Sequence, residues 1–166
     1  HSDAQYNLAI MYLKGYPIQQ DIDKAIYYLT KSADQDNSMA QCLLGNIYYE
    51  GKFKPRNIDK AIYYYTLSLN ENEPEAACKL GIIYYEGKYV KRDINKGLNF
   101  IIKAAYLNNL EAINYIGFIY YIGDYYQRDI SKAIFYWKKA SEKNYAQSLF
   151  YLGKIYYDGK YISKDI

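Results

Sequence analysis

The chain has 166 residues, of which 51% are hydrophobic and 23% charged, and its formal net charge is +3 at pH 7. This balance excludes a disordered chain and gives no sign of a strongly basic nucleic-acid binder. The sequence has no run of about 18 apolar residues and no signal-peptide pattern, so we predict no membrane insertion for this segment. Its one compositional excess is tyrosine, 25 residues against five phenylalanines and one tryptophan. An AT-rich genome would explain that excess as well as a binding surface would.

The first predicted unit is a helical hairpin. Over residues 3–14 apolar side chains recur at helical spacing, and Gly15 stands where a left-handed C-terminal cap would lie. A short turn containing Pro17 leads to Asp21, whose carboxylate can cap a second helix that starts at Ile22. The same pattern predicts further helices over 39–50, 58–70, 75–86, 94–107, 111–122, 130–143 and 147–158.

Glycine recurs with an unbroken period of 36 residues, which indicates a stack of similar units rather than one globular core. One glycine column ends the first helices: Gly15, Gly51, Gly87, Gly123 and Gly159. A second column lies inside those helices: Gly45, Gly81, Gly117 and Gly153. Glycine inside a helix costs about 1 kcal/mol relative to alanine. We therefore predict that the second helix of each hairpin packs too closely there for a side chain, although Ala9 in the first repeat shows that a methyl group is tolerated.

The second helices begin after a residue that favours the N-cap position. These residues are Asp21, Asn57, Asp93, Asp129 and Asp165. The predicted fold class is all-α, a right-handed α-solenoid of antiparallel helix hairpins. We expect one array over 1–166, made of repeats 4–39, 40–75, 76–111 and 112–147 and a partial repeat 148–166.

The repeating residues resemble the Sel-one-like repeat, a relative of the tetratricopeptide repeat. The third repeat shows the pattern best, in Ala76, Leu80, Gly81, Tyr84, Gly87, Asp93, Lys96, Phe100, Lys103, Ala104 and Ala105. The resemblance covers essentially the whole chain. It implies a non-catalytic adaptor that binds a protein or peptide partner, and it names no cofactor. One branch of that family staples each hairpin with a disulfide, and this chain lacks those cysteine pairs.

The two cysteines, Cys42 and Cys78, occupy one column of adjacent repeats. Helices that pack side by side are roughly 10 Å apart, which is too far for a disulfide. With no second cysteine pair, and with His1 as the only histidine, no zinc site is predicted.

Candidate partner-binding residues come from the first helices, which line the inner, concave face of a tetratricopeptide array. Tyrosine offers contact area and a hydroxyl, and asparagine can pair with a peptide backbone. The predicted site residues are Tyr49, Tyr85, Tyr121, Tyr157, Asn46, Asn114, Phe118, Glu50 and Glu86. Tyr85 and Tyr121 are expected to contribute most, and the glutamates favour a partner that carries lysine or arginine. The alternative is that these tyrosines merely pack along the helices. Asn114 belongs to a second column that is expected to be exposed, which also contains Cys42 and Cys78.

A second pattern lies in the hairpin turns, where basic residues alternate with aromatic ones. It comprises Arg56, Arg92, Arg128 and Lys164, with Phe53, Tyr89, Tyr125 and Tyr161 between them. Such a ladder can bind single-stranded nucleic acid, which is the second hypothesis, but solvation and local pairing explain it more simply. A hydrolase is the least favoured alternative, because the only histidine is terminal and the carboxylates do not form a convergent pair.

The partial fifth repeat has a first helix but no hairpin partner before Ile166. We expect Leu152 and Tyr156 to be partly uncovered there. Because solenoids need polar caps, either the native chain continues or this end docks on another molecule, including a second copy.

Overall fold

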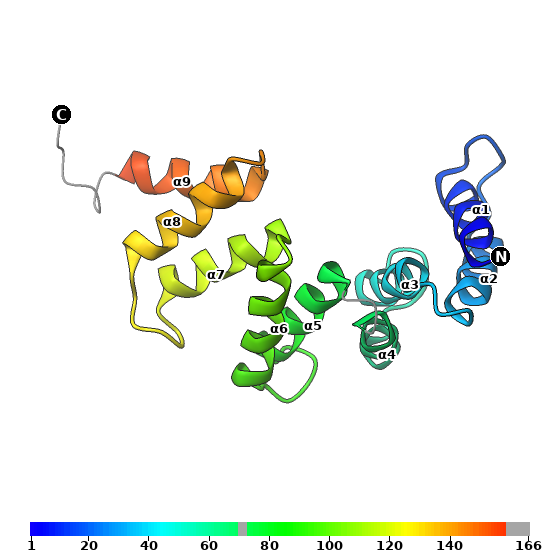
Figure 1. Ribbon diagram of the computed structural model, residues 1–166, viewed down its shortest axis with the longest axis horizontal. Coiled ribbons are helices and arrows are strands. Elements are labelled where there is room, and N and C mark those ends of the chain that lie inside the picture. Colours follow the sequence, from blue (N-terminus) through cyan, green and yellow to red (C-terminus); the bar gives the residue numbers. More distant parts are fainter. Residues whose placement is uncertain (70–72, 159–166) are drawn as a thin grey trace. The chain divides into compact units, whose positions relative to one another are not determined.

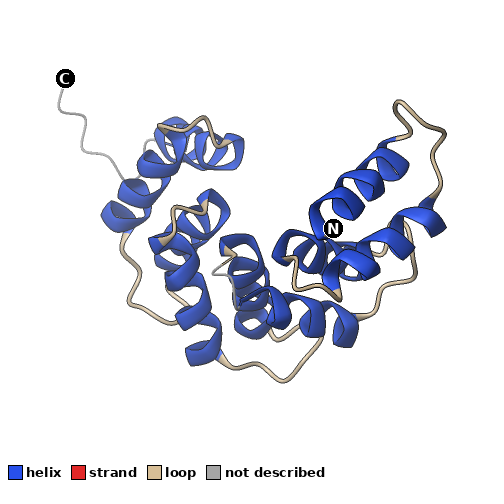
Figure 2. Cartoon of the chain, turned by 45° about the vertical axis from the view of Figure 1, so that its right-hand side comes forward, coloured by secondary structure: helices blue, strands red, loops and turns tan. Residues whose placement is uncertain are grey.

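The computed structural model describes residues 1–69 and 73–158, and that part of the chain forms nine helices and no strand (Figure 1). The helices are α1 (Ser2–Lys14), α2 (Ile22–Ala33), α3 (Ser38–Glu50), α4 (Ile58–Ser68), α5 (Pro74–Glu86), α6 (Ile94–Tyr106), α7 (Leu110–Ile122), α8 (Ile130–Ser141) and α9 (Ala146–Asp158). Short turns connect them, drawn in tan in Figure 2. The predicted helices and the all-α repeat fold are confirmed.

The chain divides into two compact units, His1–Leu80 (unit 1) and Gly81–Ile166 (unit 2). In unit 1 the hairpin α1–α2 packs on the hairpin α3–α4 through α2 and α3. In unit 2 the hairpin α7–α8 packs on α6 on one side and on α9 on the other. The expectation of one array over 1–166 stays a prediction.

The interior of each hairpin is filled by one large side chain of the second helix. These side chains are Leu29, Tyr65, Ile101 and Trp137, all fully buried. Each stands 20 residues after the small residue of the first helix. A Cβ on Gly45 would lie 2.5 Å from the Tyr65 ring, and one on Gly117 would lie 2.6 Å from the Trp137 Nε1. The predicted close approach is therefore confirmed.

The helix ends follow the predicted caps. Gly15, Gly51, Gly87 and Gly123 have left-handed φ values of 73°, 74°, 63° and 78°. Each N-cap side chain accepts a hydrogen bond at 2.9 Å from the backbone N–H three residues later, at Asp21, Asn57, Asp93 and Asp129. Gly159 and Asp165 lie outside the described residues.

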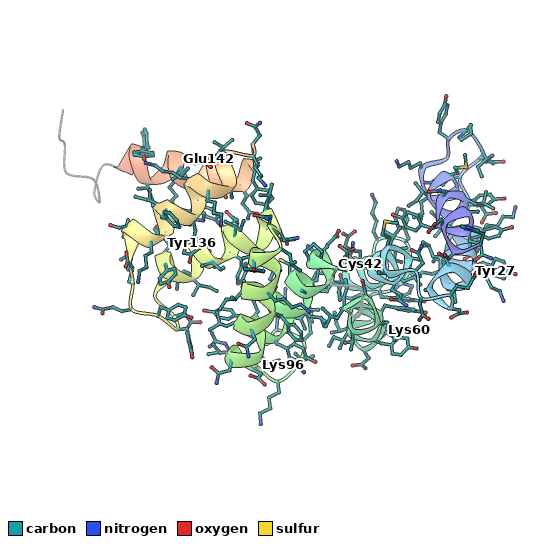
Figure 3. The ribbon with its side chains drawn as sticks, viewed as in Figure 1. Tyr27, Cys42, Lys60, Lys96, Tyr136 and Glu142 are labelled. Carbon is teal, nitrogen blue, oxygen red and sulfur yellow. The ribbon has the colours of Figure 1, made fainter. Side chains whose placement is uncertain are left out.

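A column of half-buried tyrosines joins the two helices of each hairpin by ring stacking. Ring centroids are 5.9 Å apart for Tyr12–Tyr28, Tyr48–Tyr64 and Tyr120–Tyr136, and 6.4 Å apart for Tyr84–Phe100. A lysine of the second helix lies over the first ring of each pair; Lys60 and Lys96 are two of them, and both are labelled with Tyr136 in Figure 3. Part of the tyrosine excess is thus structural.

The last described helix is only partly covered. Tyr156 is 50% exposed, as expected. The expectation for Leu152 is wrong, because it packs against Ala133 and Trp137 of α8 and is only 8% exposed.

Candidate partner-binding grooves

Tyr85 does not face an open groove, and the prediction that its ring is exposed is wrong. It is 5% exposed, because its ring meets the ring of Tyr115 edge-on with centroids 5.8 Å apart. Its hydroxyl donates to the carboxylate of Asp124 at 3.4 Å, and the guanidinium of Arg92 lies over its ring. Burial, reinforced by the charge of Asp124, raises the pKa of Tyr85 to about 12.

The rest of the tyrosine column does not form one exposed ladder. Tyr49 and Tyr121 are partly buried, and the ring of Tyr121 lies 5.5 Å from that of Trp137. Tyr157 on α9 is 90% exposed. Tyr49, Tyr85 and Tyr121 are thus buried or partly buried, and only Tyr157 is largely exposed. The alternative that these tyrosines pack along the helices therefore describes three of the four residues.

Two arginines of the turns, Arg56 and Arg92, cap the first helices. The Nε of Arg56 donates to the carbonyl of Tyr49 at 2.9 Å, and that of Arg92 donates to the carbonyl of Tyr85 at 2.8 Å. In the first repeat the Gln20 side chain makes the same bond to Leu13, at 2.7 Å. Helix C-termini leave carbonyls without partners inside the helix, and these side chains satisfy one of them. The constant separation of seven residues between the tyrosine and the arginine is the sequence signal that links the two columns.

Asn114 and the two cysteines of its column are buried, which corrects a second expectation. Asn114 is 4% exposed, and its Oδ1 accepts a hydrogen bond from the Ser148 hydroxyl at 2.8 Å. Its backbone carbonyl accepts from the Trp137 indole N–H at 3.1 Å. Cys42 and Cys78 are likewise buried and form no disulfide. Burial raises the pKa of the Cys42 thiol, so it is a poor nucleophile at neutral pH.

The first helices of unit 1 carry a groove of about 260 Å³, which we call groove A. It is lined by Tyr6, Met39, Cys42, Leu43, Asn46, Glu73 and Glu75. Asn46 holds one of its carboxylates in place, because its Nδ2 donates to Glu75 at 2.7 Å while its Oδ1 accepts from the Tyr65 hydroxyl. The groove therefore combines apolar walls with two carboxylates.

Unit 2 carries a similar groove of about 280 Å³ between α5, α7 and α9, which we call groove B. It is lined by Ile82, Glu86, Glu111, Asn114, Tyr115, Phe118, Gln147 and Tyr151. Phe118 touches two aromatic neighbours, with centroids 5.9 Å from Tyr115 and 6.0 Å from Tyr151. The hydroxyl of Tyr115 donates to Glu86 at 3.0 Å. Groove B is thus lined by aromatic side chains, and like groove A it carries two carboxylates.

Four of the predicted site residues line these grooves: Asn46, Glu86, Asn114 and Phe118. Glu50 is exposed outside them, as is Tyr157. Sequence reasoning missed Tyr115 and Tyr151. The available signal was spacing, because Glu111, Tyr115 and Phe118 follow each other at helical intervals on one face of α7.

Residues 1–69 and 73–158 contain neither a candidate metal site nor a candidate membrane-spanning helix. These residues contain no group of three histidine, cysteine, aspartate or glutamate side chains placed to hold a metal ion. None of the described helices has the length and apolar content needed to cross a bilayer.

Known proteins resemble this chain in sequence and structure. The family model described as Sel1 repeat matches residues 2–37, 38–72, 74–109, 110–145 and 146–166. The crystal structure of a Sel1 repeat protein from Oxalobacter formigenes is similar with a TM-score of 0.85 and 28% identity, over 96% of this chain and 65% of that one. The protective antigen c5321 of uropathogenic Escherichia coli, which displays an SLR fold, has a TM-score of 0.83 and 28% identity over 96% of this chain and 34% of that one.

A viral relative matches a single repeat. The putative sel1-like repeat-containing protein L18 of Acanthamoeba polyphaga mimivirus is 56% identical over 36 residues, which are 22% of this chain and 6% of that protein. The chain spans less than two thirds of the length of each of these three relatives.

Proposed function

The chain belongs to the Sel1 repeat family, and on this premise we propose that it is a non-catalytic scaffold that binds a partner polypeptide in grooves A and B. Sel1 repeat proteins are generally protein-interaction scaffolds, and the family is typically non-enzymatic. The two grooves lie on the first helices, which form the face that tetratricopeptide arrays use for ligands.

One observation carries the proposal: each unit places a pair of carboxylates beside apolar or aromatic side chains in a groove of similar size. Glu73 and Glu75 do so in unit 1, and Glu86 and Glu111 in unit 2. Such a surface favours a segment in which lysine or arginine alternates with apolar residues. The apolar contacts supply most of the affinity, and the carboxylates mainly raise the association rate and select the sign of charge.

The alternative of nucleic-acid binding through the turns is less well supported. Arg56 and Arg92 already cap their own helices, and Arg92 also pairs with Asp124. This structural role accounts for the basic residue in these two turns without a phosphate partner.

The test is selection of peptides from a random displayed library on the 166-residue chain, followed by affinity measurement with variants. Selected peptides rich in lysine or arginine are expected, and Phe118→Ala should weaken them about tenfold or more if Phe118 is a hot spot. Glu75→Gln and Glu111→Gln should mainly slow association and reduce its dependence on salt. The matched control is Glu142→Gln, an exposed glutamate that follows α8 and lines neither groove. Selected peptides whose affinity and association rate are the same for all three groove variants as for the unchanged chain would contradict the proposal. A library that yields no basic peptides would contradict it as well.

A further inference from the structure

Unit 2 has a third cavity on its second-helix side, of about 300 Å³, which we call pocket C. It lies between α6, α7 and α8, and buried Ile113 and Ile116 of α7 are among its lining residues. Around them stand Ile102 of α6, Tyr126 of the turn before α8 and Lys139 of α8, with Tyr106 at the end of α6. Figure 1 shows α6, α7 and α8 as consecutive helices of this unit, and Tyr136, another lining residue, is labelled on α8 in Figure 3.

Four of the apolar side chains that line pocket C are not imposed by the repeat. The positions two repeats earlier, in unit 1, hold Thr30 for Ile102, Asp34 for Tyr106, Gln41 for Ile113 and Lys54 for Tyr126. These four residues are polar or charged and have local tasks or are exposed; for example, the Gln41 side chain donates to the carbonyl of Ala33, and Lys54 pairs with Asp23. The repeat keeps other lining positions apolar, such as Leu44 and Ile47 in unit 1 where unit 2 has Ile116 and Ile119, but it leaves these four positions free to be polar or apolar.

The apolar residues at the mouth of pocket C are exposed. Tyr106 is 86% exposed and Ile102 is 49% exposed, and Leu107 beside them is 36% exposed. An exposed apolar cluster at the opening of an apolar cavity is unfavourable in water unless it is covered part of the time, and such clusters typically mark interaction sites. Because the exposed area extends beyond the cavity onto Leu107, and Tyr106 at the mouth is itself 86% exposed, a polypeptide covers more of this area than a small molecule held in the cavity would.

The charge of the wall indicates the sign of the partner. Lys139 is the one charged residue that lines pocket C, and it has no ion pair among the described residues. Lys143 lies in the turn after α8, four residues beyond Lys139. Lys132, seven residues before Lys139, already pairs with Asp129 at 3.6 Å. Grooves A and B have the opposite character, with carboxylates in their walls.

We propose that pocket C is a second docking site of this scaffold, for a polypeptide segment whose apolar anchor residue is flanked by aspartate or glutamate. The anchor enters the cavity above Ile113 and Ile116, while Ile102 and Tyr106 cover the segment and Lys139 pairs with its carboxylate. An amphipathic helix with anchors at successive turns fits such a site between helices. The chain then binds a basic partner on its first helices and an acidic one on the second helices of unit 2.

The test transplants the unit 1 residues into unit 2. From the same displayed library, we expect a second class of peptides with an aromatic or aliphatic residue beside aspartate or glutamate. The double variant Ile102→Thr, Tyr106→Asp should weaken this class about tenfold or more, because it removes the apolar cover and adds a repelling charge. Lys139→Glu should weaken it as well. The melting temperature of both variants should fall only slightly, since Tyr106 and Lys139 are exposed and Ile102 is half exposed.

The two sites fail independently. Glu75→Gln and Glu111→Gln should leave the acidic class unaffected, and Ile102→Thr, Tyr106→Asp should leave the basic class unaffected. Absence of an acidic class, or acidic peptides that bind the double variant as tightly as the unchanged chain, would overturn pocket C while leaving grooves A and B standing. Amide shifts at Ile102 and Ile113 produced by decanoate alone, without any acidic peptides, would assign the pocket to a small amphiphile instead.

Discussion

The hairpin α1–α2 of unit 1 and the hairpin α7–α8 of unit 2 are built on the same spacing around side chains of very different size. In the first, Ala9 and Leu29 share a core cluster; in the second, Gly117 faces Trp137. All three side chains are fully buried. Removal of one methyl group from the first helix makes room for an indole on the second. The glycine therefore makes room either for a larger ring, as at Trp137, or for a closer backbone, as at Gly81, where an added Cβ would lie 3.0 Å from the carbonyl oxygen of Gly97. Interiors are packed at near-constant density, so either one uses the freed space.

The two units differ again on their second-helix side. Unit 1 presents Thr30 and Asp34 where unit 2 presents Ile102 and Tyr106. Since both units keep the same helices with either set of residues, the fold does not dictate what stands at these surface positions. If the two units bind different partners, we expect the residues at these surface positions to differ between the units, whereas the caps and the hairpin interiors stay alike.

The largest loss of stability is expected when the large buried side chain inside a hairpin is removed. Trp137→Ala should reduce the free energy of unfolding by about 3–5 kcal/mol, because it leaves a large cavity and also removes the indole hydrogen bond to Asn114. Leu29→Ala should cost about 2–5 kcal/mol in unit 1. Hydrogen exchange should show lost protection in unit 2 for the first variant and in unit 1 for the second. An equal loss in both units for either variant would mean that the two units unfold together.

The next effect separates buried from exposed tyrosines. Tyr85→Ala should cost more than about 2 kcal/mol of stability, because the ring is packed between Tyr115 and Arg92. Tyr157→Ala, at the 90% exposed position of the same column, should change stability by less than about 0.5 kcal/mol. Urea unfolding of the two variants measures both. A small loss at Tyr85 would restore the view that this column is a free binding surface.

A smaller effect comes from the glycines. Gly117→Ala should destabilise the chain by about 1–3 kcal/mol, because its new methyl group would meet the Trp137 ring. Gly153→Ala is the matched control, since no atom lies within 4 Å of a Cβ there. It should stabilise α9 by up to about 1 kcal/mol, the helix propensity difference. Thermal unfolding of both proteins gives the sign, and two losses would show that α9 is covered.

The smallest effect is a pH dependence at alkaline pH. Tyrosine in an unfolded chain has a pKa of about 10, and the pKa of Tyr85 is raised to about 12 by burial. The folded state then keeps a proton that the unfolded state has lost. The stability from neutral Tyr85 is fully present below about pH 10 and is lost as the pH rises toward about 12. Tyr85→Phe should flatten this part of the stability profile, measured by urea unfolding between about pH 9 and 11, and an unchanged slope would contradict it.

Local patterns made the helices, caps and period predictable. Gly15 and Asp21 act on backbone groups within a few residues, so a window of the sequence contains both partners of each interaction. The close approach at Gly45 was also predictable, because a costly residue repeated at a fixed position needs a packing reason. The resemblance to a known repeat also follows from the sequence alone, because it depends only on the residues and their spacing.

Exposure was decided by the tertiary structure. The burial of Tyr85 depends on Tyr115 and Asp124, which lie 30 and 39 residues further along the chain. Asn114 is covered by Ser148 of the following repeat. Whether a residue on a first helix faces solvent is therefore set by the next hairpin as well as by its own helix. A period in the sequence reports that equivalent residues have equivalent places, and only the packing of successive hairpins determines what covers each place.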